Sequence, residues 1–459
     1  MSDSTRYPGP PALADAKSRV PMHPNVARPF ADRDPAVEVA QAYERASAAG
    51  RRLPPGDLVD ILDLERRKRT VLLDLAAEYG PVFKAIMNRR LVVCVVGDAL
   101  GRRVLKEHAK SLRPLSIEIE SLVPKGFMRG MEGETHRRYR RALVQAIACL
   151  DGRSLDAQFE AIAERALAAH AASSAEADTP TAWIDTLGTI AASCLIVMLY
   201  GVDAESDVHA RLLAAYKALG PHGVVWNITE RQAAAFRALS DEIGALAPNA
   251  GGLLRAVWAA GAADATMLGN LIYMLELGRY DLRGLLRWLS RYAADTPDWL
   301  DRIARESTAP ARDATVAEAF VLETLRMDQS ERLMRDVTED LIVEDWLIPA
   351  GALLRVCMWE AHKDAAEFAQ PFVFDPSRFL QRATATERFS PFGLDHHRCP
   401  LAESSIRIAS AFLRALAKNY EVVGRNPEPA TRGPYHWEPS SKFVVALQPR
   451  GAKRTGSPA

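Results

Sequence analysis

One cysteine in this chain lies directly before a helix-forming segment, on a loop rich in aromatic, glycine and histidine residues. The loop reads FSPFGLDHHRCPLAE, from Phe389 to Glu403, and its cysteine is Cys399. Backbone N–H groups and the helix dipole stabilise negative charge at the start of a helix. The sequence therefore favours a thiolate at this position and makes Cys399 the first candidate for chemistry.

The other cysteines do not suggest a shared site. None of them forms a C-x-x-C pair, so neither a disulfide framework nor a structural zinc site is indicated. A zinc site built from His396, His397 and Cys399 lacks a second group of ligands at a suitable spacing. The remaining four cysteines lie in apolar surroundings, where a thiol more often behaves as a small core residue; they are Cys94, Cys149, Cys194 and Cys357.

The cysteine loop resembles that of the cytochrome P-450 family, usually written FxxGxxxCxG. Phe392 lies seven residues before the cysteine and His397 lies two residues before it. The resemblance implies that Cys399 is the axial ligand of haem b (iron protoporphyrin IX), where a thiolate favours O–O bond cleavage, and that Phe392 and His397 lie beside the cofactor. Two positions depart from the family, because Asp395 and Leu401 stand where it usually has glycine.

A second motif combines acidic and basic residues. Glu323 and Arg326 in VLETLRM are three residues apart, so they lie on one face of a predicted helix. Arg378 follows in PSRF, which resembles the family segment whose arginine completes a Glu–Arg–Arg cluster. The resemblance implies a structural role, because a buried carboxylate–guanidinium network would fix the loop that carries Cys399.

A third motif supplies donors for the cofactor. His136 and Arg140 in GETHRRYRRAL are four residues apart and share a helix face. The family has the same H-x-x-x-R arrangement on the helix that meets the haem propionates. Arg335 in RDVTED is the third expected donor. Each of these residues, taken alone, is also compatible with an ordinary surface charge.

The long helix expected from Gly269 to Tyr292 departs most from the family. Aligned on Gly278, the usual acid and threonine of the oxygen-binding helix are Tyr280 and Asp281. That pair normally orients the water that delivers protons for oxygen activation. We name Asp281, Tyr280 and Arg279 as candidate catalytic residues, with Asp281 on the proton route or with Arg279 or Asp281 orienting substrate or peroxide. Consecutive helical positions are about 100° apart, so the three cannot all face inward.

The remaining pattern predicts a mainly α fold with a small β region. The segment FKAIMNRRLVVCVVG predicts a β-hairpin, residues 135–306 are largely helical, and short strands follow Glu323. A last helix is expected from Ala402 to Tyr420. The resemblance implies the cytochrome P-450 fold, as a single haem domain over residues 36–449, with an irregular segment 1–35 and a flexible tail 450–459.

Composition restricts the partners. The chain has 58 basic and 58 acidic residues, so its net charge gives no reason to expect nucleic acid binding. The amino-terminal residues lack the apolar core of a signal peptide, and we expect no stretch to reach the roughly 18 apolar residues of a spanning helix. We therefore expect a cytoplasmic monomer that does not interact with a membrane.

The resemblance implies an oxidoreductase, a monooxygenase or related oxidative tailoring enzyme that acts on a small, largely apolar organic molecule. Electrons would come from a ferredoxin-type partner that docks on a basic face. The loop from Leu112 to Met131, the turn from Ser330 to Met334 and the tip from Trp437 to Ser441 would line the pocket. The basic face would comprise Arg137, Arg138, Arg141, Arg398 and Arg407.

Two alternatives stay open. The missing threonine at position 281 favours a peroxide-driven or non-oxygen-inserting haem-thiolate enzyme. Asp395 and Leu401 leave room for a non-catalytic haem-binding or docking protein, although such a protein would not need the thiolate.

Overall fold

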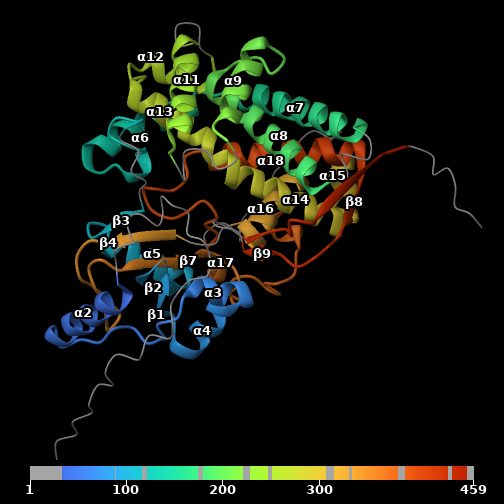
Figure 1. Ribbon diagram of the computed structural model, residues 1–459. Helices are drawn as coiled ribbons and strands as arrows, with labels where there is room; N and C mark the ends of the chain where they lie inside the picture. Colours follow the sequence, from blue (N-terminus) through green and yellow to red (C-terminus); the bar gives the residue numbers. More distant parts are fainter. Residues whose placement is uncertain are drawn as a thin grey trace, which may run out of the picture. The chain divides into compact units, whose positions relative to one another are not determined.

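The computed structural model describes ten stretches of the chain and divides it into two compact units (Figure 1). Unit 1 comprises the described parts of residues 1–116, 331–371 and 393–398, and unit 2 comprises the described parts of 117–330, 372–392 and 399–459. Most of the predicted segment 1–35 and tail 450–459 lies outside the described residues, and the boundaries of the expected domain stay a prediction. The described residues are 34–87, 89–115, 121–173, 179–220, 228–246, 251–306, 315–329, 333–380, 388–432 and 437–451.

Unit 1 holds a five-stranded sheet with the order β1-β2-β7-β4-β3, in which β2 and β7 are parallel and the other neighbours are antiparallel. A separate hairpin pairs β5 with β6. The strands are β1 (Val82–Met87), β2 (Arg90–Val96), β3 (Leu112–Pro114), β4 (Leu333–Val337), β5 (Leu341–Val343), β6 (Trp346–Ile348) and β7 (Leu353–Cys357). The helices are α2 (Pro35–Ala48), α3 (Ile61–Arg67), α4 (Val71–Tyr79), α5 (Asp98–Glu107) and α17 (Met358–Ala361).

The hairpin predicted from FKAIMNRRLVVCVVG is the β1–β2 pair. Strand β2 is apolar along nearly its whole length because both of its faces are covered. Val93 and Val95 point into one apolar cluster, whereas Val92 and Cys94 point into another on the opposite face. Because side chains alternate between the two faces of a strand, this one apolar segment contributes to both clusters.

Unit 2 is mainly helical. Its α-helices are α6 (Gly133–Ala148), α7 (Gly152–Ala172), α8 (Pro180–Tyr200), α9 (Asp207–Ala218), α11 (Glu230–Leu246), α12 (Gly252–Ala259), α13 (Ala265–Leu277), α14 (Arg283–Asp295), α15 (Pro297–Glu306), α16 (Val316–Thr324) and α18 (Ala402–Asn419). Short turns are the 3-10 helices η2 (Met128–Gly130) and η6 (Pro376–Phe379) and the π-helical turns η4 (Gly278–Leu282) and η5 (Leu325–Gln329). The strands β8 (Tyr420–Arg425) and β11 (Val444–Pro449) form one antiparallel pair, and β9 (Thr431–Arg432) and β10 (Trp437–Glu438) form another.

The core of unit 2 surrounds α8, which lies beside α7, and α18 packs along α7 in turn (Figure 1). Thr179 caps the start of α8 by accepting the Ala182 N–H, and Gly201 ends it in a left-handed conformation. The last eleven residues of α8 are all buried. An apolar helix without a polar face is the expected composition for a helix enclosed on all sides.

The expectation that no stretch is apolar enough to span a membrane was wrong for α8. An 18-residue window of this helix has a mean hydropathy of 1.8, and by length and composition alone it passes as a candidate span. Of that window, 67% is buried inside the protein, as in the core helix of a globular unit. The prediction of a mainly α fold with a small β region is confirmed.

Candidate functional site

The loop that carries Cys399 is closed by its own backbone. The Cys399 N–H donates to the Phe392 carbonyl oxygen at 2.9 Å, so the two ends of the motif are fixed next to each other. Cys399 lies three residues before Ala402, where α18 begins, and its side chain is half-buried. The structure therefore places the thiol at the amino-terminal end of a long helix, as the sequence predicts.

The thiol of Cys399 differs from the others. Cys94, Cys194 and Cys357 are buried in cores, and burial raises the pKa of Cys194 and of Cys357 well above the ordinary value for a thiol. Cys149 is exposed. Cys399 alone among the five is half-buried, and it lies against the unit 2 core at the start of a helix. This combination suits a thiolate ligand.

Asp395 and Arg335 form an ion pair within unit 1. The carboxylate accepts from the Arg335 guanidinium at 2.8 Å, and its other oxygen accepts the His397 N–H at 2.7 Å. Asp395 has a φ of +57°, in the left-handed region that glycine and, less often, aspartate adopt. The aspartate therefore fulfils the conformational role of the expected glycine and adds a charged partner for Arg335, the predicted propionate donor.

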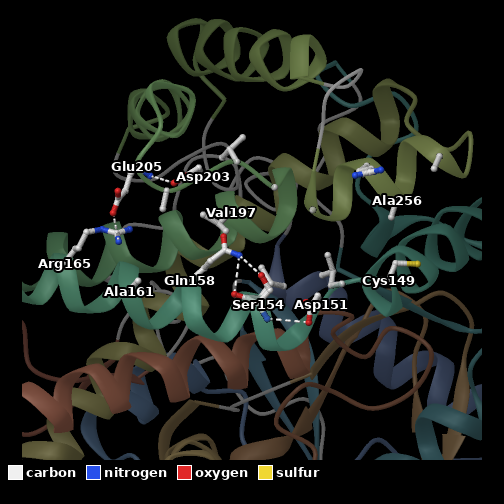
Figure 2. A pocket seen from close by; sticks show the side chains of 18 residues that line it. Cys149, Asp151, Ser154, Gln158, Ala161, Arg165, Val197, Asp203, Glu205 and Ala256 are labelled. Carbon is white, nitrogen blue, oxygen red and sulfur yellow. Dashed lines mark hydrogen bonds and ion pairs between the residues drawn. The ribbon is translucent and has the colours of Figure 1, made fainter. Parts of the chain in front are cut away.

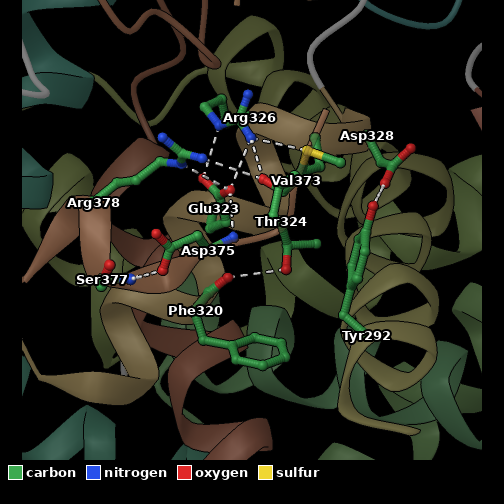
Figure 3. Close-up of polar contacts among 11 residues, drawn as sticks. Tyr292, Phe320, Glu323, Thr324, Arg326, Asp328, Val373, Asp375, Ser377 and Arg378 are labelled. Carbon is green, nitrogen blue, oxygen red and sulfur yellow. Dashed lines mark hydrogen bonds and ion pairs between the residues drawn. The ribbon is translucent and has the colours of Figure 1, made fainter. Parts of the chain in front are cut away.

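Glu323, Arg326 and Arg378 come together in unit 2 (Figure 3). Arg326 donates to both oxygens of Glu323 at 2.8 Å, and neither side chain is exposed to solvent. The Arg378 guanidinium lies 3.4 Å from Glu323 Oε1, which also accepts the Asp375 N–H at 2.8 Å. The network joins α16 to a segment about fifty residues later, as expected from the two sequence motifs.

His136 and Arg140 lie one turn apart on α6. His136 is buried and Arg140 is half-buried, so this helix face is partly covered by unit 2. The next residue on the buried side, Tyr139, donates its hydroxyl to Asp264 at 2.6 Å. The helix that carries both predicted propionate donors is thus fixed to the start of α13.

The long central helix is interrupted by a π-helical turn at the position aligned with the family's oxygen-binding signature. The turn η4 covers Gly278 to Leu282, between α13 and α14. A Cβ on Gly278 would lie 2.2 Å from Leu195 Cδ1, so any larger residue would force the buried Leu195 side chain of α8 to move. Single π-helical turns often mark functional sites, and sequence reasoning did not predict this one.

The three candidate catalytic side chains of the π-helical turn lie in different surroundings. Arg279 is 8% exposed; it pairs with Glu276 at 2.8 Å and lies over the Tyr216 ring at 4.4 Å. Burial alone lowers the pKa of Arg279, but Glu276 and Tyr216 raise it, and the net shift is upward. Its guanidinium therefore contributes to packing against α9, and its predicted catalytic role stays a prediction.

Tyr280 and Asp281 differ from Arg279. Tyr280 is half-buried, and burial raises the pKa of its phenol to about 12, so this hydroxyl stays protonated near neutral pH. Asp281 is exposed, and its charge acts on Tyr273, two turns earlier on α13. Of the three candidates, Asp281 is the charged group that is accessible for proton transfer.

The donor set suits haem better than a bare metal ion. Within the described residues, no group of three or more histidine, cysteine, aspartate or glutamate side chains is arranged to hold a metal ion. A single half-buried thiol before a helix is instead the kind of ligand that holds the iron of a thiolate-ligated haem. The roles predicted for Cys399, His136 and Arg140, and for His397 and Arg335, stay predictions.

Sequence reasoning missed a set of polar contacts on α13. Asn270, at 1% exposure, accepts the Met128 N–H at 2.6 Å, and Thr266 donates to the Pro124 carbonyl at 2.7 Å. A polar residue within the apolar run LGNLIYML was the available signal. Of the residues predicted to line the pocket, Val123 and Phe127 are buried against this helix, whereas Ile117 and Ser330 lie outside the described residues.

One pocket in unit 2 contains none of the predicted site residues. It has a volume of about 970 Å³ and lies between α7, the carboxyl end of α8 and α12 (Figure 2). Its polar groups pair with each other, as in the Arg165–Glu205 ion pair at 3.0 Å and the Gln158 to Ser154 hydrogen bond at 3.2 Å. We assign it no chemistry.

Comparisons with known proteins agree with this geometry. Residues 310–430 match the family model of cytochrome P-450, which includes Glu323, Arg326, Arg378 and Cys399. The chain is 27% identical over 178 residues to abscisic acid 8'-hydroxylase 1 of Arabidopsis thaliana, covering 35% of this chain and 38% of that protein. It is 26% identical over 200 residues to ent-kaurenoic acid oxidase 1 of Hordeum vulgare, covering 40% of each. The chain thus matches about two fifths of the length of these curated relatives.

The fold resembles solved structures over a much larger part of the chain. The retinoic acid bound cyanobacterial CYP120A1 superposes with a TM-score of 0.67 at 17% identity, covering 87% of this chain and 99% of that one. At such low identity the likeness concerns the fold alone.

Proposed function

We propose that the chain is a haem-thiolate oxidoreductase of the cytochrome P-450 superfamily, with Cys399 as the axial ligand of the iron. The observation that carries the proposal is the position of this thiol. It is half-buried three residues before α18, on a loop whose ends are joined by the Cys399–Phe392 backbone hydrogen bond. The helix start stabilises the thiolate form that ligation requires.

The haem would supply oxygen chemistry at its iron, and the chain supplies the surroundings. The Glu323–Arg326–Arg378 network fixes the segment that leads to the cysteine loop, because a buried bidentate pair restricts both partners. His136 and Arg140 would bind propionate oxygens from α6. Haem b is the cofactor that we propose for this donor set.

Proton delivery is the step in which this chain departs from the family. Asp281 occupies the position of the usual alcohol and is exposed, so its carboxylate can accept and return a proton. Tyr280 keeps its proton near neutral pH and would serve only as a hydrogen-bond donor or acceptor. We propose that Asp281 alone performs the proton delivery that the acid–alcohol pair performs in the family.

The proposed substrate is a small, largely apolar organic molecule. Val123 and Phe127, two apolar residues of the loop expected to line the pocket, are buried against the central helix. Two relatives are named for acting on abscisic acid and on ent-kaurenoic acid, which supports a substrate of this size. Monooxygenation is the reaction that we propose, with electrons from a ferredoxin-type donor.

Two of the arginines expected on the basic face, Arg137 and Arg407, form ion pairs with carboxylates of this chain. Arg407 pairs with Asp156 at 2.8 Å and with Glu403 at 3.1 Å, and Arg137 pairs with Glu134 at 2.9 Å. Arg138 and Arg141 on α6 are exposed. These two arginines are therefore the best candidates for docking an acidic donor, and turnover should fall as salt rises.

The test of the proposal is the spectrum of the purified protein, reduced and exposed to carbon monoxide. A red-shifted Soret band that is lost in Cys399→Ser and kept in Cys149→Ser is the expected result. An ordinary haem band in the wild type, or no bound haem, would overturn the proposal.

A second candidate is a peroxide-driven or non-oxygen-inserting enzyme. The observation that favours it is the absence of an alcohol at position 281, together with the π-helical turn there. Turnover with hydrogen peroxide and without a reductase would identify it, and Asp281→Thr would then lower this activity. A non-catalytic haem-binding protein would give the same red-shifted spectrum but no turnover with either oxidant. The cytoplasmic location and the monomeric state stay predictions.

A further inference from the structure

The helix α14 holds a segment near the carboxyl end of the chain, residues 437–440, which we call the tip. The guanidinium of Arg287 forms an ion pair with Glu438 and donates to the Pro439 carbonyl oxygen at 2.9 Å. The side chain of Arg287 is 8% exposed, whereas that of Glu438 is 35% exposed. One buried cation therefore binds two neighbouring residues of the tip.

The tip has two further attachments. The indole Nε1 of Trp288, the residue after Arg287, donates to the Trp437 carbonyl oxygen at 2.9 Å. At the other end of the tip, the Ser440 hydroxyl donates to Glu428 at 3.0 Å. Trp437 and Ser440 are both buried. The tip is thus fixed at both ends, and two of its carbonyl oxygens are bound by side chains of α14.

The central helix holds a second segment in the same way. Asn270 on α13 accepts the Met128 N–H at 2.6 Å and donates to the Gly126 carbonyl oxygen at 3.3 Å. Along the helix, this attachment comes before the π-helical turn that carries Asp281, and the attachment of the tip comes after it. Both segments belong to regions that the sequence predicts to line the substrate pocket. The structure therefore attaches two of the predicted pocket segments to the helix that carries the proposed proton-transfer group.

Arg287 is harder to bury than an apolar residue would be. Removing its charge from water carries a desolvation penalty, so a buried ion pair often stabilises a protein no more than apolar residues of similar volume. The guanidinium adds direction, because its fixed donors bind the Glu438 carboxylate and the Pro439 carbonyl in one geometry. The contact is therefore better suited to fixing the position of the tip than to raising stability.

We propose that Arg287 is a positioning residue, which keeps the tip in place as a pre-formed wall of the ligand site. The inference rests on the proposed haem-thiolate function. A ligand that touches a wall already in place does not have to order it, so the affinity for such a ligand depends on Arg287. A ligand too small to reach the tip binds independently of Arg287.

The first test compares imidazole with 4-phenylimidazole, which share the nitrogen ring that binds haem iron and differ by one apolar ring. Both are titrated into the haem-containing protein, and binding is followed by the shift of the Soret band. In Arg287→Met we expect the affinity for 4-phenylimidazole to fall about fivefold, on the order expected for immobilising one side chain, and the affinity for imidazole to stay unchanged. Arg287→Lys keeps the charge and should restore part of the loss. An equal change for both ligands, or no change for 4-phenylimidazole, would overturn the positioning role.

The order of the tip is measured directly by hydrogen exchange. In Arg287→Met the backbone N–H groups of Glu438 and Ser440 should exchange faster, and in Arg287→Lys the increase should be smaller. The matched control is Arg211→Met, because the Arg211–Glu242 pair at 3.6 Å is exposed and joins α9 to α11. It should change neither the exchange of the tip nor either affinity. Unchanged exchange in Arg287→Met would contradict the proposal.

A second variant keeps the test decisive if Arg287→Met does not fold. Trp288→Phe removes only the Nε1 donor and should shift both readouts in the same direction by a smaller amount. Unchanged exchange and unchanged affinities in Trp288→Phe would then overturn the proposal. The haem-thiolate function can fail separately: an ordinary carbon monoxide band together with the loss specific to 4-phenylimidazole would overturn that function and leave the positioning role intact.

Discussion

At the residue scale, Asp395 occupies a left-handed backbone conformation at a position where the family usually has glycine. Its carboxylate uses one oxygen for Arg335 and the other for the His397 N–H. The side chains of the pair are 4% and 15% exposed, so solvent screens their attraction only weakly. The aspartate therefore stabilises the loop that leads to Cys399.

Replacing Asp395 by glycine should destabilise the protein, although glycine is the family residue. Glycine tolerates the conformation but removes both contacts, and we expect the free energy of unfolding to fall by about 1–3 kcal/mol. Asp395→Asn keeps the oxygen that accepts the His397 N–H, so it should lower the free energy of unfolding by less than Asp395→Gly does. Urea denaturation measures both, with Asp340→Asn in the exposed Arg45–Asp340 pair as the control. An unchanged unfolding midpoint in Asp395→Gly would contradict this account.

The lowered pKa of His209 predicts how the stability of the protein depends on pH. Burial lowers the pKa of His209 below its ordinary value of 6.5, and the charge of Arg165 lowers it further. Below pH 6.5 the unfolded chain therefore binds a proton that the folded chain resists, so stability falls as pH falls. In His209→Leu we expect a smaller loss of stability between about pH 7.5 and about pH 5.5. Thermal unfolding of the wild type and of His209→Leu at both pH values measures this difference. The control variant His108→Gln should lose as much stability as the wild type.

At the element scale, the π-helical turn η4 is where the central helix packs against α8, through Gly278 and Leu195. The close contact of Gly278 with Leu195 leaves no room for a side chain, and Leu195 is itself buried at 4% exposure. The extra residue in the turn also separates Arg279, which faces Glu276 and Tyr216, from Asp281, which is exposed.

Gly278→Ala should destabilise the protein by about 1–3 kcal/mol, because the new methyl group overpacks a filled core. Gly244→Ala on α11 is the matched control: a Cβ there would have no atom within 4 Å, so the change should stabilise the helix by about 0.5–1 kcal/mol. The double variant Gly278→Ala with Leu195→Ala should remove the clash. Chemical denaturation of all four proteins gives the comparison, and equal effects at the two glycines would refute the packing argument.

At the scale of the whole molecule, ion pairs of two kinds connect distant parts of unit 2. The network of Glu323 joins α16 to residues 373–378; Glu323 and Arg326 are fully buried, and the Arg378 side chain is 14% exposed. In contrast, α7 and α18 are joined by three pairs that reach the surface, namely Asp156–Arg407, Glu160–Arg414 and Glu164–Lys418. Surface pairs contribute little, whereas breaking a buried pair leaves an uncompensated charge.

Glu323→Gln should therefore lower the free energy of unfolding by about 3–5 kcal/mol, and Glu164→Gln by less than about 1 kcal/mol. Added salt should change the stability of the Glu164 variant less than that of the wild type, because the surface attraction is already removed. Calorimetric unfolding at two salt concentrations measures both effects. A small cost for Glu323→Gln would show that the network is not a structural requirement.

The sequence by itself determined the local features. The order of the motifs identified the thiol of Cys399, the Glu323–Arg326 pair and the mainly helical composition, because these depend on residue type and on short spacings along the chain. The hairpin β1–β2 was predicted for the same reason, since its two strands are adjacent in sequence.

The tertiary structure alone decided which distant groups meet. The partner of Arg335 is Asp395, sixty residues away, and Asn270 holds a segment more than one hundred and forty residues earlier. It also showed that α8, apolar enough to resemble a membrane span, is a core helix, and that Arg279 belongs to packing with Glu276 and Tyr216. Hydrogen bonds and ion pairs act over a few ångströms in space, so their partners follow from packing and not from spacing in the chain.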